Sequence, residues 1–143
     1  MRSNMLGIGL CVMVGAASVP SVLAETPPPR ERVALSPHER EHLRAGMRVY
    51  LESIQGIVEG LAKHDFKHAA RAAAKSGVAS IKDVPVALAL RLPPQFTLMS
   101  VDTHERFDAL AKDARELHTN FAVQKRLDDV LRNCTSCHAM YRF

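Results

Sequence analysis

The chain has 143 residues, of which 47% are hydrophobic and 24% charged, and its formal net charge is +4. This length is enough for one globular domain with a buried core. Two Tyr, five Phe and no Trp leave few of the large residues that strands favour, so the composition indicates an all-α protein. Three cysteines are too few for a disulfide-rich scaffold, and the composition also excludes collagen and low-complexity disorder.

The first 24 residues have the features of a secretory signal peptide. Arg2 is followed by an apolar stretch over residues 5–19, which is shorter than the roughly 20 residues needed to cross a bilayer. Residues 22–24, Val-Leu-Ala, form a cleavage site with small residues at its first and last positions. We therefore expect cleavage after residue 24, export to the periplasm, and no membrane span in the mature chain. An uncleaved N-terminal anchor is the alternative.

Charge gives little indication of a nucleic-acid partner. Loss of Arg2 with the signal peptide lowers the net charge to +3, and no run of Lys or Arg exceeds two residues. The sequence pI of about 9.2 therefore indicates mild basicity rather than a phosphate-binding stripe.

Residues 25–35 predict an extended leader, because they contain three consecutive prolines and charges without periodicity. We expect order to start at Ser36, where Ser-Pro-His-Glu over residues 36–39 is a capping box that opens a helix. The helix is expected to run to about Lys63, because its apolar residues alternate spacings of four and three. These residues are Leu43, Met47, Tyr50, Ile54, Ile57 and Leu61.

Three further helices follow along the chain. Asp65 can cap a second helix over residues 66–76, rich in Ala and closed by Gly77. The apolar link 78–93 is expected to contain a short helical turn over residues 86–90, and helical spacing returns from Pro94 to about Leu117. The last helix, capped by Thr119 or Asn120, is expected to run to about Arg142. Its apolar face comprises Val123, Leu127, Val130, Cys134, His138 and Tyr141.

Four amphipathic helices with mostly short connections favour an antiparallel up-down-up-down bundle over residues 36–143. In that topology the start of the first helix, the start of the third and the end of the fourth lie at one end of the bundle. The link 78–93 would cross at the same end, where it could cover a pocket.

The most specific motif is Cys134-Thr135-Ser136-Cys137-His138, which has the C-x-x-C-H pattern of c-type haem attachment. Two thiols one helical turn apart can reach the two vinyl groups on one porphyrin edge. The histidine that follows then directs its imidazole at the iron. We therefore expect one covalent haem c, held by Cys134 and Cys137, with His138 as the proximal iron ligand.

Three other uses of the cysteine pair are less well supported. A structural zinc site needs two more ligands, and the spacing of His64 and His68 is not accompanied by a second cysteine pair. A redox dithiol needs a low-pKa cysteine at a helix start in a βαβ setting. A disulfide between residues three apart in a helix is strained and closes a very short loop. Export also favours haem, which bacteria attach to such motifs outside the cytoplasm.

A four-helix chain that ends in this motif, followed by Tyr141-Arg142, resembles the class II cytochromes c. These comprise the cytochrome c-prime group and its low-spin, methionine-ligated relatives. The resemblance covers roughly residues 36–143, and the C-terminal position of the motif separates it from class I, where the motif lies near the N-terminus. It implies a periplasmic electron carrier that meets redox partner proteins and has no catalytic residues for an organic substrate. Many relatives form homodimers through their first two helices, which the sequence leaves open here.

The resemblance also implies a role for Met47. In the family, the position about eleven residues into the first helix faces the open side of the iron. It is a methionine in low-spin members and a bulky apolar residue in five-coordinate, gas-binding members. Met47 and His138 are therefore the expected iron ligands. The second helix and the link 78–93 depart from the family pattern, so the covering of the pocket cannot be carried over.

Two further functions stay open at this point. One is a five-coordinate haem protein that binds small gases such as nitric oxide, with Met47 as a packing residue. The other is a structural or chaperone-like helical protein without haem. Of the remaining histidines, we expect His104 to be a flank residue with local hydrogen bonds, although one helical turn from Phe107 it could also reach the pocket edge. Arg48, Arg132 or Arg142 could neutralise the haem propionates.

Overall fold

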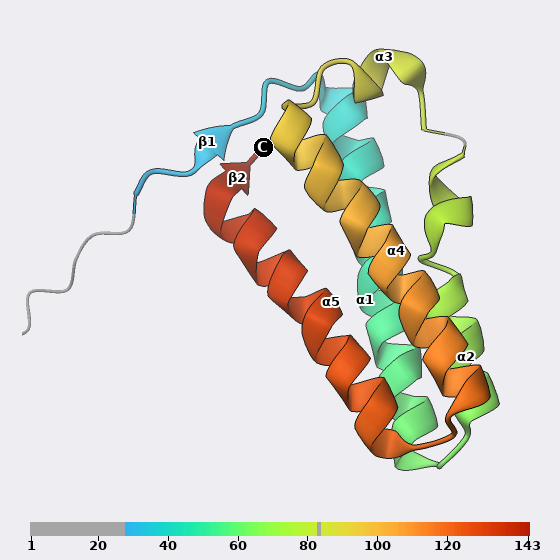
Figure 1. The fold of residues 1–143 in the computed structure, drawn as a ribbon. Helices are drawn as coiled ribbons and strands as arrows, with labels where there is room; N and C mark the ends of the chain where they lie inside the picture. The colour runs from blue at the N-terminus through green and yellow to red at the C-terminus, as the bar shows by residue number, and fades with distance from the viewer. Residues whose placement is uncertain (1–27, 83) are drawn as a thin grey trace, which may run out of the picture.

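The structure, a computed structural model, describes residues 28–82 and 84–143, so the expected signal peptide lies outside the described residues. The described part is mostly helical, which confirms the expected all-α class, with one small two-stranded sheet (Figure 1). In chain order its elements are β1 (Glu31–Arg32), α1 (Pro37–Ala62), α2 (Phe66–Ala74), the 3₁₀-helix η1 (Val78–Ile81), α3 (Val86–Ala89), α4 (Pro94–Glu116), α5 (Asn120–Met140) and β2 (Tyr141–Arg142).

The expected starts of α1, α2 and α5 are confirmed by their caps. The Oγ of Ser36 accepts from the backbone N–H of Glu39 at 3.3 Å, and the Glu39 carboxylate accepts from the Ser36 N–H at 2.8 Å. Both halves of the capping box are thus present. Asp65 caps α2 by accepting from the N–H of His68 at 2.8 Å, and Thr119 caps α5.

The main core lies between α1, α2, α4 and α5. α2 packs against both α1 and α4, and α5 packs mainly against α4, with much less contact to α1. The residues buried between these helices are aliphatic and small, apart from one phenylalanine. They are Ile57, Leu61, Ala69, Ala70, Ala72, Ala73, Phe107, Leu110, Ala111, Ala114, Val123, Leu127 and Val130.

Small residues bring α1 and α2 close together. A Cβ placed on Gly60 would lie 2.7 Å from the backbone nitrogen of Ala69, and one on Gly56 would lie 2.7 Å from the Ala72 Cβ. The alanine-rich face of α2 therefore packs where a larger side chain would not fit. α2 is shorter than expected and ends at Ala74 rather than at residue 76.

A second cluster of buried residues closes the other end of the molecule, which we call the cleft end. It contains Val33 and Leu35 from the N-terminal segment, Leu88 from α3, Phe96 from α4 and Tyr141 from β2. The start of α1 reaches the same end through Leu43, which packs against this cluster. Figure 1 shows these elements together at the top of the view.

The N-terminal segment, residues 28–35, is extended as expected but is ordered by contact with the C-terminus. β1 pairs in parallel with β2, with Glu31 opposite Tyr141, and the Val33 N–H donates to the Arg142 carbonyl at 2.9 Å. Order thus begins before Ser36, because Val33 is only 4% exposed. The same pairing explains why α5 ends at residue 140, since Tyr141 leaves the helix to pair and to pack on the core.

Candidate functional site

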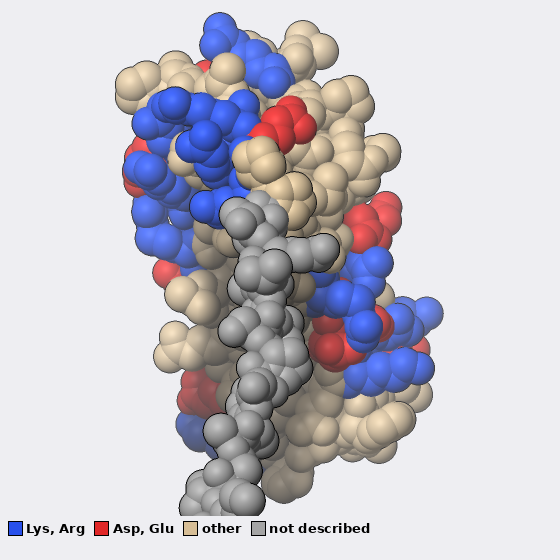
Figure 2. All heavy atoms as spheres, turned by 90° about the vertical axis from the view of Figure 1, so that its left-hand side faces the viewer, with Lys and Arg blue, Asp and Glu red and all other residues tan. Residues whose placement is uncertain are grey.

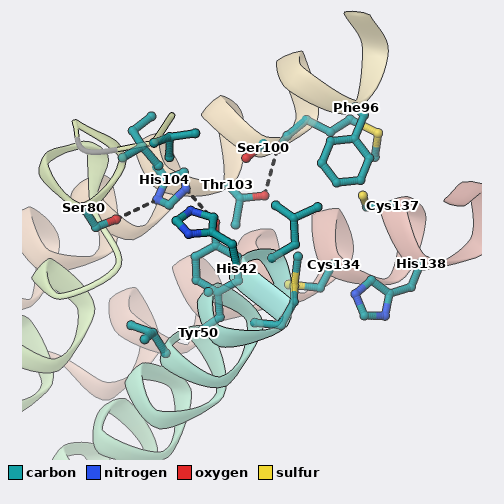
Figure 3. A pocket seen from close by; sticks show the side chains of 17 residues that line it. His42, Tyr50, Ser80, Phe96, Ser100, Thr103, His104, Cys134, Cys137 and His138 are labelled. Atoms are coloured by element: carbon teal, nitrogen blue, oxygen red, sulfur yellow. Dashed lines mark hydrogen bonds between the residues drawn. The ribbon is translucent and has the colours of Figure 1, made fainter. Parts of the chain in front are cut away.

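A cleft of about 180 Å³ opens at the cleft end between α1, α4 and α5, with η1 and the following link at its side (Figure 3). All four residues expected to bind a cofactor line it: Cys134, Cys137 and His138 from α5, and Met47 from α1. Most of the other lining side chains are apolar or neutral. They are His42, Leu43, Gly46, Val49, Tyr50, Ser80, Ile81, Val84, Phe96, Met99, Ser100, Thr103 and His104.

The two cysteines are free thiols one helical turn apart on α5, and both are partly buried. Burial raises the pKa of the Cys134 thiol above its ordinary value. Burial likewise raises the pKa of Cys137, and the neighbouring Cys134 thiolate would raise it further. At neutral pH both side chains are therefore thiols, whereas a redox dithiol needs a lowered pKa at its attacking cysteine.

His138 lies in the last turn of α5 and its side chain is exposed at the edge of the cleft. In Figure 3 the imidazole projects from the same helix as the two cysteines. Its exposure follows from its position in the last turn of α5, which ends two residues later. An exposed imidazole at this position can offer a ring nitrogen as a metal ligand.

Two methionines lie on the walls of the cleft. Met47 projects from α1 and Met99 from the first turns of α4, and both are partly buried. Met140, in contrast, is 44% exposed and does not line the cleft. The geometry therefore leaves two thioether sulfurs that a cofactor in the cleft could meet.

Sequence reasoning was wrong about His104, which is not a flank residue. It is only 4% exposed, lines the cleft, and its Nε2 lies 2.6 Å from the Tyr50 hydroxyl. Its Nδ1 lies 2.8 Å from the carbonyl of Ser76, which can only accept, so Nδ1 donates there and Nε2 accepts from Tyr50. Its partners are 54 and 28 residues away along the chain, and no local pattern indicated them.

This hydrogen-bonded pair fixes the inner wall of the cleft. Tyr50 stacks on Phe107 with ring centroids 5.6 Å apart, and burial raises the pKa of its hydroxyl well above the ordinary value. Nearby, the Asn133 amide donates to the Thr103 hydroxyl at 2.7 Å. The polar groups at the inner end are thus bonded to one another and held in place.

Two further findings concern only residues 28–82 and 84–143. No group of three or more His, Cys, Asp or Glu side chains is placed there to hold a metal ion, and His68 instead lies 3.6 Å from the Glu59 carboxylate. Within the same residues, no helix has both the length and the apolar character needed to cross a bilayer.

No protein-family model matches this chain, and neither a curated protein nor a solved structure is significantly similar to it. The resemblance to class II cytochromes c therefore depends on the residues and motif themselves. Function has to be argued from the cleft.

Proposed function

We propose that this protein is an exported c-type cytochrome that carries single electrons between redox partner proteins in the periplasm. One haem c is bound covalently through Cys134 and Cys137, with His138 as proximal ligand and Met47 as sixth ligand. The protein catalyses no reaction on an organic substrate. A bound haem would supply the iron, which changes between ferrous and ferric states.

The observation that carries this proposal is the convergence on one cleft of Cys134, Cys137 and His138 from α5 with Met47 from α1. The motif alone requires only that the first three residues be near one another. Met47 is about ninety residues away in sequence, and its presence on the same cleft gives a haem two ligands on different helices. The two free cysteines also support attachment, because thioether formation adds a thiol S–H across a vinyl C=C bond without any oxidant.

The lining of the cleft suits a mainly apolar group that remains partly exposed. Leu43, Phe96 and Met99 offer apolar contacts, and the two cysteines are available at one edge. The volume of about 180 Å³ is smaller than the roughly 300 Å³ at which pockets for drug-sized ligands begin. A porphyrin in this cleft would therefore be incompletely buried, with His138 near the surface, as an electron carrier requires of its redox group.

We further propose that α1, α2, α4 and α5 form an antiparallel up-down-up-down bundle with the haem at the cleft end. Packing of α2 on α1 and α4, and of α4 on α5, supports this topology. The weak contact between α1 and α5 supports a cofactor between those two helices.

A second candidate is a five-coordinate haem protein that binds small gases such as nitric oxide. The observation in its favour is that polar side chains, among them Ser100, line the cleft beside its apolar residues. In this case Met47 would be a packing residue.

Whole-protein mass spectrometry of periplasmic material tests the proposal. We expect the mass of residues 25–143 plus one haem, with both thiols consumed, and the pyridine haemochrome spectrum of a haem with two thioether bonds. Replacing Cys134 or Cys137 by Ala should leave a single thioether or a loosely held haem. An unmodified mass from a strain competent in cytochrome c maturation would overturn the proposal.

A further inference from the structure

Arginines gather around the cleft end of the molecule. Figure 2 shows Lys and Arg side chains crowded in the upper part of the face that carries β1 and β2, with few Asp or Glu among them. Residues 28–48 and 141–143 contain six arginines and no lysine, and we call these arginines the arginine face. They are Arg30, Arg32, Arg40, Arg44, Arg48 and Arg142.

Most of this charge has no ionic partner. Arg48 lies 2.7 Å from the Glu41 carboxylate. Within the described part of the chain, Arg30, Arg32, Arg44 and Arg142 form no ion pair with a carboxylate. On α4 and α5 the arginines at 106, 126 and 132 are paired with aspartates. Arg71 on α2 and Arg115 on α4 form no ion pair within the described residues, but they are not grouped with other arginines as those of the arginine face are.

The arginine face borders the candidate site. Arg30 Nη1 donates to the backbone carbonyl of His138 at 3.5 Å, and Arg142 Nε donates to the Arg30 carbonyl at 3.4 Å. On α1, Arg44 lies between residues 43 and 46, both of which line the cleft. Arg30 and Arg44 thus lie next to residues that line the cleft.

We propose that the arginine face is a docking surface for a protein with an acidic surface. Guanidinium groups are always charged and bind carboxylates in a bidentate manner, and concentrated charge of one sign accelerates association with a partner of the opposite sign. That this partner exchanges electrons at the cleft rests on the proposed function. The docking surface itself is inferred without the proposed electron-carrier function.

An acidic protein fits this face better than an anionic bilayer does. Binding at a membrane interface normally adds buried apolar side chains to electrostatic attraction. In the described chain, β1, β2 and residues 37–48 expose no large apolar side chain. Next to this surface, Val49 is 40% and Met140 44% exposed, so the surface offers mainly charge and hydrogen-bond donors and little apolar area to insert into lipid.

A charge-reversal comparison tests the proposal. The variant Arg32→Glu/Arg44→Glu changes the arginine face. Its matched control is Arg71→Glu/Arg115→Glu, which changes the net charge equally at exposed positions on α2 and α4. The probes are a fluorescent poly-L-glutamate of about 20 residues and phosphatidylglycerol vesicles, titrated at low and high salt. Circular dichroism confirms that both variants fold.

We expect Arg32→Glu/Arg44→Glu to weaken poly-L-glutamate binding about tenfold or more, and the control to weaken it far less. Added salt should reduce the difference. Equal losses in the two variants would show a net-charge effect and overturn the proposal. Vesicle binding that depends on Arg32 and Arg44, with no such dependence for poly-L-glutamate, would also overturn it in favour of a membrane surface.

The two proposals fail separately. Poly-L-glutamate binding does not require haem, so a haem-free mass combined with face-specific binding would overturn the electron-carrier function and support the docking surface. A haem-containing protein whose binding is equally weakened in both variants would support the function and overturn the surface.

Discussion

The thiol groups of Cys134 and Cys137 determine what the motif can do at neutral pH. Because burial raises both pKa values, protein isolated without haem should react with iodoacetamide more slowly at pH 7.5 than the same chain unfolded in urea. The rate should rise as the pH passes the raised pKa, and the midpoint should lie above that of the unfolded chain. Restricted access of iodoacetamide to the thiols would slow the reaction at every pH but would not move this midpoint. The pH profile therefore separates the effect of access from the effect of the raised pKa. A midpoint below that of the unfolded chain would indicate a redox dithiol instead.

Met47 and Met99 form a matched pair for testing the sixth ligand, since both line the cleft and both are partly buried. We expect Met47→Leu to convert the absorption spectrum of the oxidised protein from low-spin to high-spin iron, and the reduced variant to bind carbon monoxide readily. Met99→Leu should leave the iron low-spin, because Met99 acts as a packing residue. An unchanged low-spin spectrum in Met47→Leu would show that Met47 is a packing residue and that another residue supplies the sixth iron ligand.

Residues differ in how far local sequence predicted their position. Cys134 and Met47 could be assigned to one cleft because helical spacing places each on the inward face of its helix, and Cys137 was assigned by the C-x-x-C-H motif. His104 could not be assigned, because its burial depends on Tyr50 and Ser76, which belong to other elements. His138 has the spacing of a buried residue, but its exposure depends on where α5 ends.

At the scale of elements, α1 needs glycine at residue 60, where it packs closely on α2, whereas Gly46 makes no contact with α2 and lines the cleft. Gly60→Ala would bring a Cβ within 2.7 Å of the Ala69 backbone nitrogen, and backbone atoms cannot easily move. We expect a loss of about 1–3 kcal/mol in the free energy of unfolding, measured in urea. Gly46→Ala places its Cβ in open space and should instead stabilise α1 by up to about 1 kcal/mol. Similar values for both variants would contradict this packing.

The elements themselves were largely predictable. Capping residues Ser36, Asp65 and Thr119 are local signals, and each accepts the backbone hydrogen bond expected of a helix N-cap. The C-terminal ends of α2 and α5 were each placed about two residues too late, because no local residue specifies the turn at which tertiary contacts replace helical hydrogen bonds.

At the scale of the whole molecule, the N-terminal segment ties the C-terminal end of α5 to the rest of the fold. Leu35 is 9% exposed and packs with Tyr141 and Phe96. Leu35→Ala should lower the free energy of unfolding by about 2 kcal/mol and accelerate hydrogen exchange of the Val33 amide, which pairs with β2. Ala34→Ser, at an exposed neighbouring position, serves as the control and should change neither quantity. Unchanged exchange in Leu35→Ala would show that the segment does not depend on this contact.

The sequence by itself determined the all-α class, the starts of the helices and the C-x-x-C-H motif at the end of the last long helix, because periodicity, caps and motif spacing act over a few residues. Only the tertiary structure decided that residues 28–35 pack on the C-terminus, that His104 bonds to Tyr50, and that unpaired arginines from both chain ends meet beside the cleft. These features join residues dozens to more than a hundred positions apart. Their pairing depends on how the helices pack, and no local pattern contains that information.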